Sequence, residues 1–376
     1  MSRNPLIFLL LAGLMVVGCG KNDPPEQARP ERTVIVYMAA SNNLESYALD
    51  NINQMEKAIT GKDQQLLVYI DVRGKTPRVL KITHDTSAEI VSPAVINYAN
   101  HNSASAAVLK QVLEDIRAAY PAASYGLIMW SHASSWMPPG TRPVTESFGD
   151  DGGEQMDIRE LKNALPGTYE YIIFDACSMA SVEVLYELRN KTERILAAPT
   201  ETLASGMPYD LVLPYLFTGR DGLQTVAKKY VEYYQEYGEE EDSLYRSATI
   251  TLVDTRQLNQ LASSTRAVLE NATFSDPDYH REEIQRLDFE YIPATESYDF
   301  MDFFRKNLPS EDLQPLATQL EKTVLFSQYT DEFLGRPIKT FSGLTCYIPH
   351  AGDDLLNAYY SSLEWSQASG FDLLVK

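Results

Sequence analysis

The sequence predicts an α/β protein whose mostly parallel sheet is covered by helices on both faces, followed by a C-terminal region of mixed α+β character. Apolar runs rich in β-branched and aromatic residues recur between residues 33 and 199. Helical patterns separate these runs, as the crossover connections of parallel strands require. Beyond about residue 220 this alternation loosens. The two patterns together favour a layered α/β core with a C-terminal extension.

The expected strands of the core are short and almost wholly apolar, at 33–40, 65–72, 124–130, 169–176 and 193–199. Residues 78–91 suggest a small β excursion. Helices with 3.6-residue periodicity are expected at 44–59, 103–120, 156–165 and 180–190. The C-terminal region predicts helices at 221–242, 256–272 and 312–325, and strands at 247–255 and 342–349.

The first residues are of a different kind from the rest of the chain. Arg3 precedes an apolar run that is too short to span a bilayer comfortably, which is the layout of a secretory signal peptide. Cys19 follows Val16, Val17 and Gly18, and this resembles the lipobox at which bacterial lipoproteins are cleaved and acylated. An ordinary cleaved signal is the alternative. We therefore expect a lipid-anchored protein of the bacterial cell envelope, facing the periplasm or the cell surface.

The expected organisation has four parts: a signal peptide (1–18), a lipidated Cys19 with a charged, proline-rich tether (19–32), an α/β core (33–220) and a C-terminal region (221–376). The boundary near residue 220 is soft. The C-terminal helical patterns are compatible with a region that completes the same sheet or with one that folds separately.

The formal net charge of −20 argues against nucleic acid as a partner, because phosphate binding needs clustered Lys and Arg. A negative field instead favours cationic substrates. Cys177 and Cys346 lie far apart in the sequence and in apolar contexts, so we expect both to be free thiols.

Two residues stand out because they follow apolar strands of the expected parallel sheet. His132 comes shortly after 124–130, and Cys177 comes directly after 169–176. The carboxyl ends of parallel strands meet at one edge, where functional groups gather. A Cys and a His within reach of each other form a nucleophilic pair, and the start of a following helix would support the thiolate.

Structural roles are the alternative for each residue. A lone Cys beside a strand is usually a small buried apolar residue, and we expect that role for Cys346. The sequence has no CxxC pair, HExxH motif, GxSxG elbow or phosphate-binding loop, so no metal site is predicted.

Five segments together resemble the clostripain family of cysteine peptidases: VYMAASNNLESYA, LIMWSHASSW, FDACSMASVEVLYEL, PTETLASGMPYD and SGLTCYIP. The resemblance runs from about residue 33 to near the C-terminus and implies a caspase-like fold. It implies that His132 is the catalytic histidine, Cys177 the nucleophile and Asp175 the carboxylate that accepts Arg or Lys before the scissile bond. Asp175 as the N-cap of the next helix is the alternative.

Further expectations concern the surroundings of this pair. The backbone N–H groups of Ala133 and Cys177 are candidate oxyanion donors, although the family often has Gly where Ala133 and Ser135 stand. Thr200 and Glu201 follow the strand at 193–199 and are expected to line the pocket. No third member of a catalytic triad is identifiable.

The segment 137–156 reads as a long mobile loop, and its only basic residue, Arg142, precedes Pro143. Several members of the family cut themselves in this loop, but a peptide bond before proline is generally a poor substrate for peptidases. We therefore expect activity without a cut, or processing elsewhere, for example after Arg159 or Lys162. The family's founding member uses calcium, and two acidic runs here offer oxygen ligands, but neither matches an EF-hand loop. We expect no cofactor. A caspase-like peptidase of other specificity and an inactive peptide- or glycan-binding lipoprotein are the competing interpretations.

Overall fold

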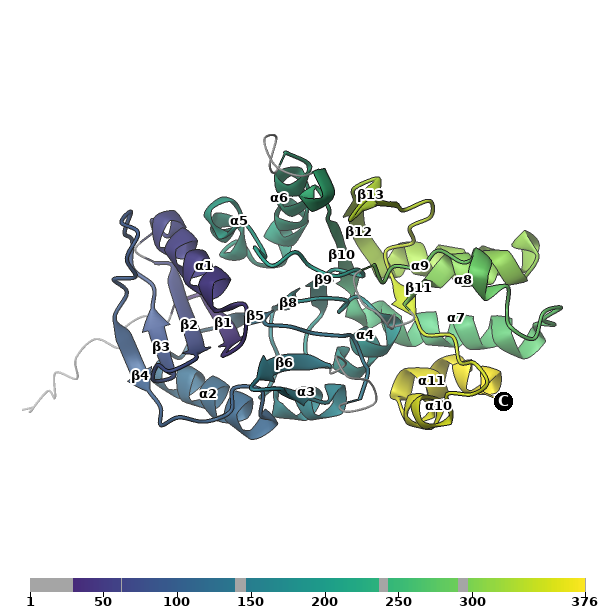
Figure 1. Cartoon of the computed structure of the whole chain (residues 1–376), viewed down its shortest axis with the longest axis horizontal. Coiled ribbons are helices and arrows are strands. Elements are labelled where there is room, and N and C mark those ends of the chain that lie inside the picture. The colour runs from purple at the N-terminus through teal and green to yellow at the C-terminus, as the bar shows by residue number, and fades with distance from the viewer. Residues whose placement is uncertain (1–29, 62, 139–146, 237–242, 290–296, 376) are drawn as a thin grey trace, which may run out of the picture.

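A computed structural model describes residues 30–61, 63–138, 147–236, 243–289 and 297–375. The largest sheet in these ranges has nine strands in the order β12-β10-β9-β8-β5-β1-β2-β3-β4 (Figure 1). Its middle five strands, from β9 to β2, are mutually parallel, and β10 and β3 flank them in antiparallel pairing. The predicted α/β class is confirmed.

The strands of this sheet, in chain order, are β1 (Arg32–Ala40), β2 (Gln65–Val72), β3 (Arg78–Lys81), β4 (Ala94–Asn97), β5 (Ser124–Trp130), β8 (Tyr171–Asp175), β9 (Arg194–Ala197), β10 (Thr249–Asp254) and β12 (Val324–Tyr329). Successive side chains of a strand point to opposite faces. In β1, Ile35 and Tyr37 belong to one apolar cluster, whereas Val34 and Val36 belong to another. A strand buried on both faces needs a continuous apolar run, and this explains why the sequence signal was strong.

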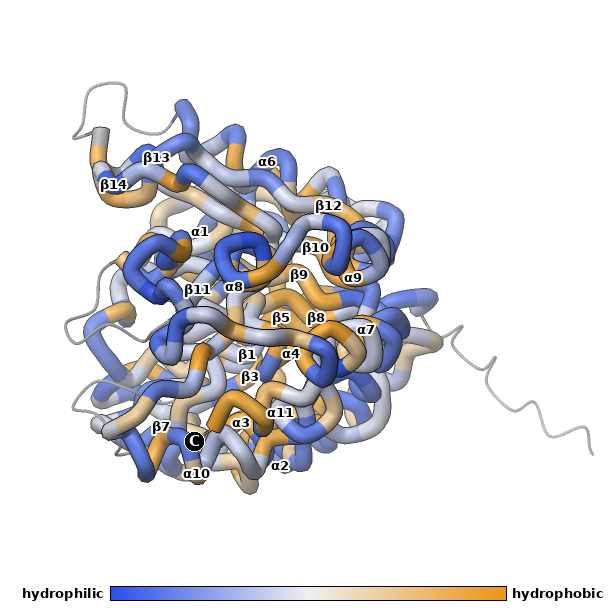
Figure 2. Tube along the Cα trace, turned by 90° about the vertical axis from the view of Figure 1, so that its right-hand side faces the viewer, coloured by the Kyte–Doolittle hydropathy of each residue, from blue (hydrophilic) through white to orange (hydrophobic). Residues whose placement is uncertain are grey.

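Helices cover both faces of the sheet. One face packs against α1 (Glu45–Ala58), α5 (Tyr209–Leu216) and α6 (Leu223–Glu236). The other packs against α2 (Ala106–Ala119), α3 (Ile158–Ala164), α4 (Val182–Leu188) and α7 (Leu258–Asn271). The same cluster takes in α8 (Phe300–Asn307), α9 (Ser310–Thr323), α10 (Asp354–Ser361) and α11 (Glu364–Ser369). In Figure 2 the middle strands β5, β8 and β9 are apolar, with hydrophilic segments outside them.

Several predicted elements differ from those observed. The segment 342–349 forms only β15 (Thr345–Cys346), which pairs with β11 (Tyr298–Asp299) outside the large sheet. The helix expected at 312–325 ends at Thr323, and the chain then enters β12. Since β12 is half-exposed at the sheet edge, its residues alternate in burial and lack a continuous apolar run.

The segment expected to be one loop, 137–156, contains a hairpin in its described part. β6 (Phe148–Asp151) and β7 (Glu154–Met156) pair around a turn in which Gly152 and Gly153 both have positive φ. A turn with φ > 0 at both central residues favours glycine, and it suits a two-residue hairpin. Arg142 and Pro143 lie outside the described residues.

The remaining elements are short. They are the hairpin β13 (Glu332–Phe333) with β14 (Arg336–Pro337), and the 3₁₀ turns η1 (Gly219–Gly222), η2 (Ser243–Tyr245), η3 (Thr255–Gln257), η4 (Arg281–Glu283) and η5 (Phe371–Leu374). No helix within the described ranges is long and apolar enough to cross a membrane.

The boundary expected near residue 220 falls within one sheet. β10 pairs with β9, and β12 pairs with β10, so residues beyond 220 extend the sheet of the core. The C-terminal region therefore shares the core's backbone hydrogen bonding as well as its apolar cluster.

Candidate active site

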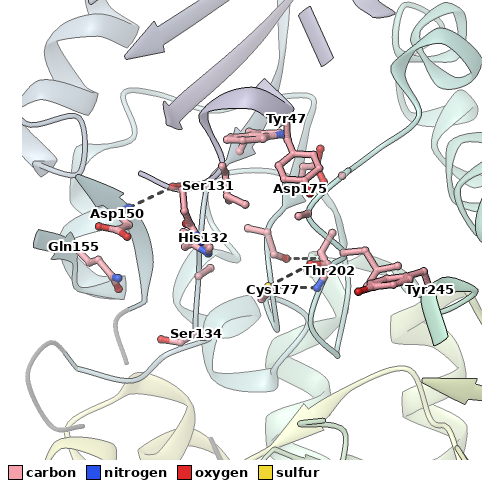
Figure 3. Close-up of a pocket in the computed structure, with 18 of the residues that line it drawn as sticks. Tyr47, Ser131, His132, Ser134, Asp150, Gln155, Asp175, Cys177, Thr202 and Tyr245 are labelled. Carbon is pink, nitrogen blue, oxygen red and sulfur yellow. Dashed lines mark hydrogen bonds between the residues drawn. The ribbon is translucent and has the colours of Figure 1, made fainter. Parts of the chain in front are cut away.

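A pocket of about 660 Å³ opens at the carboxyl ends of the central strands, and His132, Asp175 and Cys177 all line it (Figure 3). The register of the sheet explains this meeting. Trp130 of β5 lies beside both Met38 of β1 and Asp175 of β8, so β5 and β8 end at the same level and β1 runs two residues further, to Ala40. The residues that follow each strand therefore share one edge, as the sequence predicted.

His132 lies two residues beyond β5, on a segment tied to its neighbours on both sides. The Ser131 hydroxyl donates to the Ala39 carbonyl oxygen at 2.7 Å, and the Gly149 N–H donates to the His132 carbonyl oxygen at 3.0 Å. The imidazole is half-buried, and its Nε2 lies 2.6 Å from Oδ1 of Asn43. The backbone at Ser131 and His132 is thus held by β1 and β6, and the ring itself contacts Asn43.

Cys177 lies two residues beyond β8, and its side chain is mostly buried at 8% exposure. The Thr202 N–H donates to Sγ at 3.3 Å, and Sγ lies 3.7 Å from the Thr202 carbonyl oxygen. The expected support from a helix start is wrong, because α4 begins only at Val182. Ser178 has a φ of 60° and its N–H bonds the Thr200 carbonyl at 2.7 Å, so the chain turns before it can become helical.

Asp175 is the last residue of β8 and is only 4% exposed. Its Oδ2 accepts hydrogen bonds from the Met207 N–H at 3.0 Å and from the Tyr209 hydroxyl at 2.9 Å. Burial raises the pKa of this carboxyl to about 6, although both hydrogen bonds oppose that shift. The alternative role as a helix cap is wrong, because the Ser181 side chain caps α4 by accepting from the Val184 N–H.

The backbone of Ala133 also lines the pocket. Ala133 forms an antiparallel bridge with Phe148, and the hydrogen bonds at this bridge come from the N–H groups of Ser134 and Gly149. Replacing a glycine is costly only where the backbone has a positive φ. Of the two positions at which the family often has glycine, Ser135 has a positive φ (66°) and Ala133 does not. The alanine therefore imposes no backbone strain on the residue next to His132.

The expectation that Thr200 and Glu201 line the pocket is wrong. Both are fully buried: the Thr200 hydroxyl lies 2.8 Å from that of Thr249 in β10, and Glu201 Oε1 accepts from the Phe289 N–H at 2.8 Å. Strand β10 pairs with β9 and covers its edge, so the first residues that follow β9 are buried. The chain reaches the pocket only from Thr202 onward.

Sequence reasoning missed other pocket residues. Asn43 follows β1 at the same sheet edge, so the criterion that selected His132 and Cys177 applied to it equally. Thr202 was missed because the prediction stopped one residue earlier, at Glu201. Tyr245 and Leu334 come from the C-terminal region, and no local pattern announces their place in the pocket.

Cys177 and Cys346 are both free thiols, as predicted. Cys346 is buried in the core, and burial raises its pKa well above the ordinary thiol value. In the described ranges, no three or more His, Cys, Asp or Glu side chains gather to hold a metal ion. Within the acidic segment 148–157, Asp151 accepts hydrogen bonds from Ser103 and Asp157 caps α3. The second acidic run, 238–242, lies outside the described residues.

Two alternative processing points lie within a helix. Arg159 and Lys162 are in α3, where Lys162 forms an ion pair with Glu187 at 3.0 Å. Peptidases bind their substrates as extended chains, so a cut after either residue would require α3 to unwind. The structure therefore disfavours this expectation. Cys19 lies outside the described residues.

Comparison with known proteins also indicates a cysteine peptidase. The clostripain family, peptidase family C11, matches residues 36–367. A secreted C11 cysteine protease from Bacteroides thetaiotaomicron, named iotapain, is 26% identical with a TM-score of 0.79, over 91% of this chain and 99% of that chain. An inactive zymogen C11 protease from Parabacteroides distasonis is 27% identical with a TM-score of 0.78, over 91% and 98%.

A third solved structure is a clostripain from Bacteroides thetaiotaomicron in complex with the peptide inhibitor BTN-VLTK-AOMK. It is 29% identical with a TM-score of 0.52, over 59% of this chain and 97% of that chain. No curated protein sequence matches the chain. The family match spans the sheet, the pocket and the C-terminal helices alike, and the chain belongs to the clostripain family of cysteine peptidases.

Proposed function

We propose that this peptidase cleaves peptide bonds after Arg or Lys, with Cys177 as nucleophile and His132 as acid and base. The observation that carries the proposal is the placement of Cys177, His132 and the buried carboxyl of Asp175 in one pocket. The first two residues supply the chemistry, and the third supplies a reason for a cationic side chain to bind beside them.

The reaction follows from these groups. Sγ of Cys177 attacks the carbonyl carbon of the scissile bond while His132 holds the thiol proton, which it then delivers to the leaving amine. Water hydrolyses the resulting thioester, with His132 accepting its proton and returning it to the departing thiol. The backbone N–H groups of Ala133 and Cys177 are the proposed donors to the oxyanion.

Asp175 is the proposed selector. Oδ2 is engaged by Met207 and Tyr209, whereas Oδ1 accepts no hydrogen bond from the described residues. A buried carboxylate is costly unless a cation is near, and a bound Arg or Lys would offset that cost. The inhibitor of the related clostripain agrees in kind, since the peptide VLTK in its name ends in lysine.

The test uses fluorogenic peptides that differ only in the residue before the scissile bond: Arg, Lys, Asp or Leu. We expect cleavage after Arg and Lys, its complete loss in Cys177→Ala and in His132→Ala, and its retention in Cys346→Ala. Activity that survives in Cys177→Ala would overturn the assignment. Selective cleavage after Asp or Leu would support a peptidase of other specificity, and an inert Cys177 thiol would support a binding scaffold.

The proposed steps involve no metal ion, so the same assay is run with calcium and with a chelator, and equal rates are expected. We also propose that the protein is exported and anchored through Cys19, in line with the secreted relative. Labelling with a palmitate analogue that disappears in Cys19→Ala would support the anchor, and unlabelled secreted protein would contradict it.

A further inference from the structure

The imidazole of His132 has a partner that no sequence motif announced. Asn43 lies in the turn between β1 and α1, three residues after β1 ends, and its Oδ1 is 2.6 Å from His132 Nε2. β1 and β5 are neighbouring parallel strands, with Met38 beside Trp130. β1 runs two residues beyond Met38, so its end lies at the level of His132, and the turn that follows brings Asn43 to the imidazole.

The direction of this hydrogen bond fixes the state of the ring. A carboxamide oxygen only accepts, so Nε2 carries the hydrogen and donates it to Asn43. In the neutral imidazole, Nδ1 is then the unprotonated nitrogen and is the one able to take a proton. A histidine whose tautomer is set in this way keeps Nδ1 free of a proton and able to act as a base, whereas in the other tautomer Nδ1 would already be protonated and Nε2 would have no hydrogen to donate to Asn43.

The turn that carries Asn43 is itself anchored by its neighbour. The buried Asn42 donates through Nδ2 to the Ala39 carbonyl at 3.1 Å and to the Asp150 carbonyl at 2.8 Å. Its Oδ1 accepts from the Leu44 N–H at 2.8 Å. Asn42 thus joins the turn to β1 and β6, and β6 also holds the His132 backbone through Gly149. Both partners of the Asn43–His132 hydrogen bond are therefore positioned by the same strand.

We propose that Asn43 is the positioning residue of the catalytic histidine: it sets the Nε2–H tautomer of His132 and stabilises the imidazolium that forms when the ring takes the thiol proton. The proposal rests on the proposed role of His132 with Cys177. A hydrogen bond from a charged donor is stronger than one from a neutral donor, so the contact strengthens as the ring becomes charged. The stabilisation by Asn43 is therefore greatest when His132 has taken the thiol proton.

An amide and a carboxylate would affect this ring differently. A carboxylate would raise the pKa of the imidazole and so favour the imidazolium over the neutral base. The neutral amide orients the ring while leaving its two charge states closer in free energy. The other titratable side chains lining the pocket are Tyr47, Asp150, Asp175, Cys177 and Tyr245, and the variants below leave them all in place.

The kinetic test compares Asn43→Ala, Asn43→Asp and the parent protein on the Arg peptide. Loss of one hydrogen bond to a charged group predicts a kcat lower by about 10- to 100-fold in Asn43→Ala, with KM within about twofold. Asn43→Asp recovers part of the loss, because it still accepts from Nε2–H. Asn53→Ala, which removes an amide within α1 that donates to the Ala88 carbonyl, serves as the control and retains activity.

The spectroscopic test reads the ring directly. Histidine ¹⁵N NMR of Cys177→Ala, with His132 assigned by its loss in a second variant, is expected to show the Nε2–H tautomer. The pKa of His132 is expected to fall in Asn43→Ala and to rise in Asn43→Asp. The opposite tautomer, or an unchanged kcat and pKa in Asn43→Ala, would overturn the proposal.

The proposed function and the role of Asn43 are contradicted by different results. Activity that persists in His132→Ala or Cys177→Ala would remove the proposed function itself. Loss of activity in those variants together with parent-like behaviour of Asn43→Ala would leave the function standing and remove only the role of Asn43.

Discussion

Asp175 combines full burial with a carboxyl that faces a pocket. Its folded-state pKa of about 6 lies above the ordinary value of 3.8, because burial penalises the charged form. Because the pKa is raised in the folded state, the contribution of Asp175 to stability is fully present below about pH 4 and is lost as the pH rises through 6. The residue is thus kept at a cost of about 2–3 kcal/mol at neutral pH, and this favours a role in binding.

Asp175→Asn tests both the stability cost of the buried carboxyl and its role in binding. The amide oxygen can still accept from Met207 and Tyr209, so the fold is retained and the thermal midpoint at pH 8 rises above that of the parent. The difference shrinks toward pH 4, where the parent carboxyl is protonated. Cleavage of the Arg peptide falls by roughly 30- to 1,000-fold, because a desolvated charge pair is lost. An unaltered preference for Arg would contradict the selector role.

A substitution at Gly206 provides a second test at the same site. Its φ is +66°, and an added Cβ would lie 2.8 Å from Asp175 Oδ2. Gly206→Ala should displace the carboxyl, reduce cleavage after Arg and cost about 1–2 kcal/mol of stability. Gly153→Ala is the matched control, since its φ is +88° but nothing lies within 4 Å of the added Cβ. Equal loss of activity in both variants would show that backbone strain alone is responsible.

At the scale of elements, buried carboxylates fasten the C-terminal region to the core. Glu183 of α4 accepts from the Tyr347 N–H at 2.9 Å and the Tyr360 hydroxyl at 3.3 Å. Glu201 accepts from the Phe289 N–H. In both cases a buried side chain accepts a hydrogen bond from a backbone N–H of the C-terminal region. This accounts for Glu201 better than the pocket role that its sequence position suggested.

Glu183 gives this arrangement a measurable pH dependence. Burial raises the pKa of its carboxyl to about 7. Its contribution to stability is therefore complete at low pH and is lost as the pH rises through 7. The urea midpoint should fall between pH 6 and pH 8, and Glu183→Gln should reduce that fall.

Glu187→Gln is the comparison on the same helix. It removes the ion pair with Lys162 and is expected to lower the midpoint at both pH values. A pH-dependent fall that is unchanged in Glu183→Gln would show that another group is responsible.

At the scale of the whole molecule, the C-terminal region supplies part of the pocket. Leu334, in the turn between β13 and β14, lines it together with Tyr245. These side chains offer apolar surface to substrate, and neither carries a group that the proposed reaction uses. Changes there should alter substrate binding more than the chemical step.

Leu334→Asn is therefore expected to raise KM severalfold with little change in kcat. Leu334 has a φ of 48°, a conformation that asparagine also adopts, so the substitution removes apolar surface without new backbone strain. Leu355→Asn, at a side chain that is 82% exposed and distant from the pocket lining, is the control. A fall in kcat alone would place Leu334 in the chemistry instead.

The sequence by itself determined the central strands and the residues that follow them. Apolar runs such as 65–72 and 124–130 match β2 and β5 because a strand buried on both faces has no polar positions to blur the signal. His132 and Cys177 could be selected because the end of a parallel strand is a local feature. Their meeting followed from the parallel order of β5 and β8.

Only the tertiary structure decided what depends on pairing between distant segments. The strand β10 buries Thr200 and moves the pocket to Thr202, and β12 is too exposed to show an apolar run. Asn43 meets His132 through the register of β1 with β5. Leu334 reaches the pocket from a hairpin far along the chain. Such contacts are long-range, and no local periodicity encodes them, because each residue's own segment is compatible with many partners.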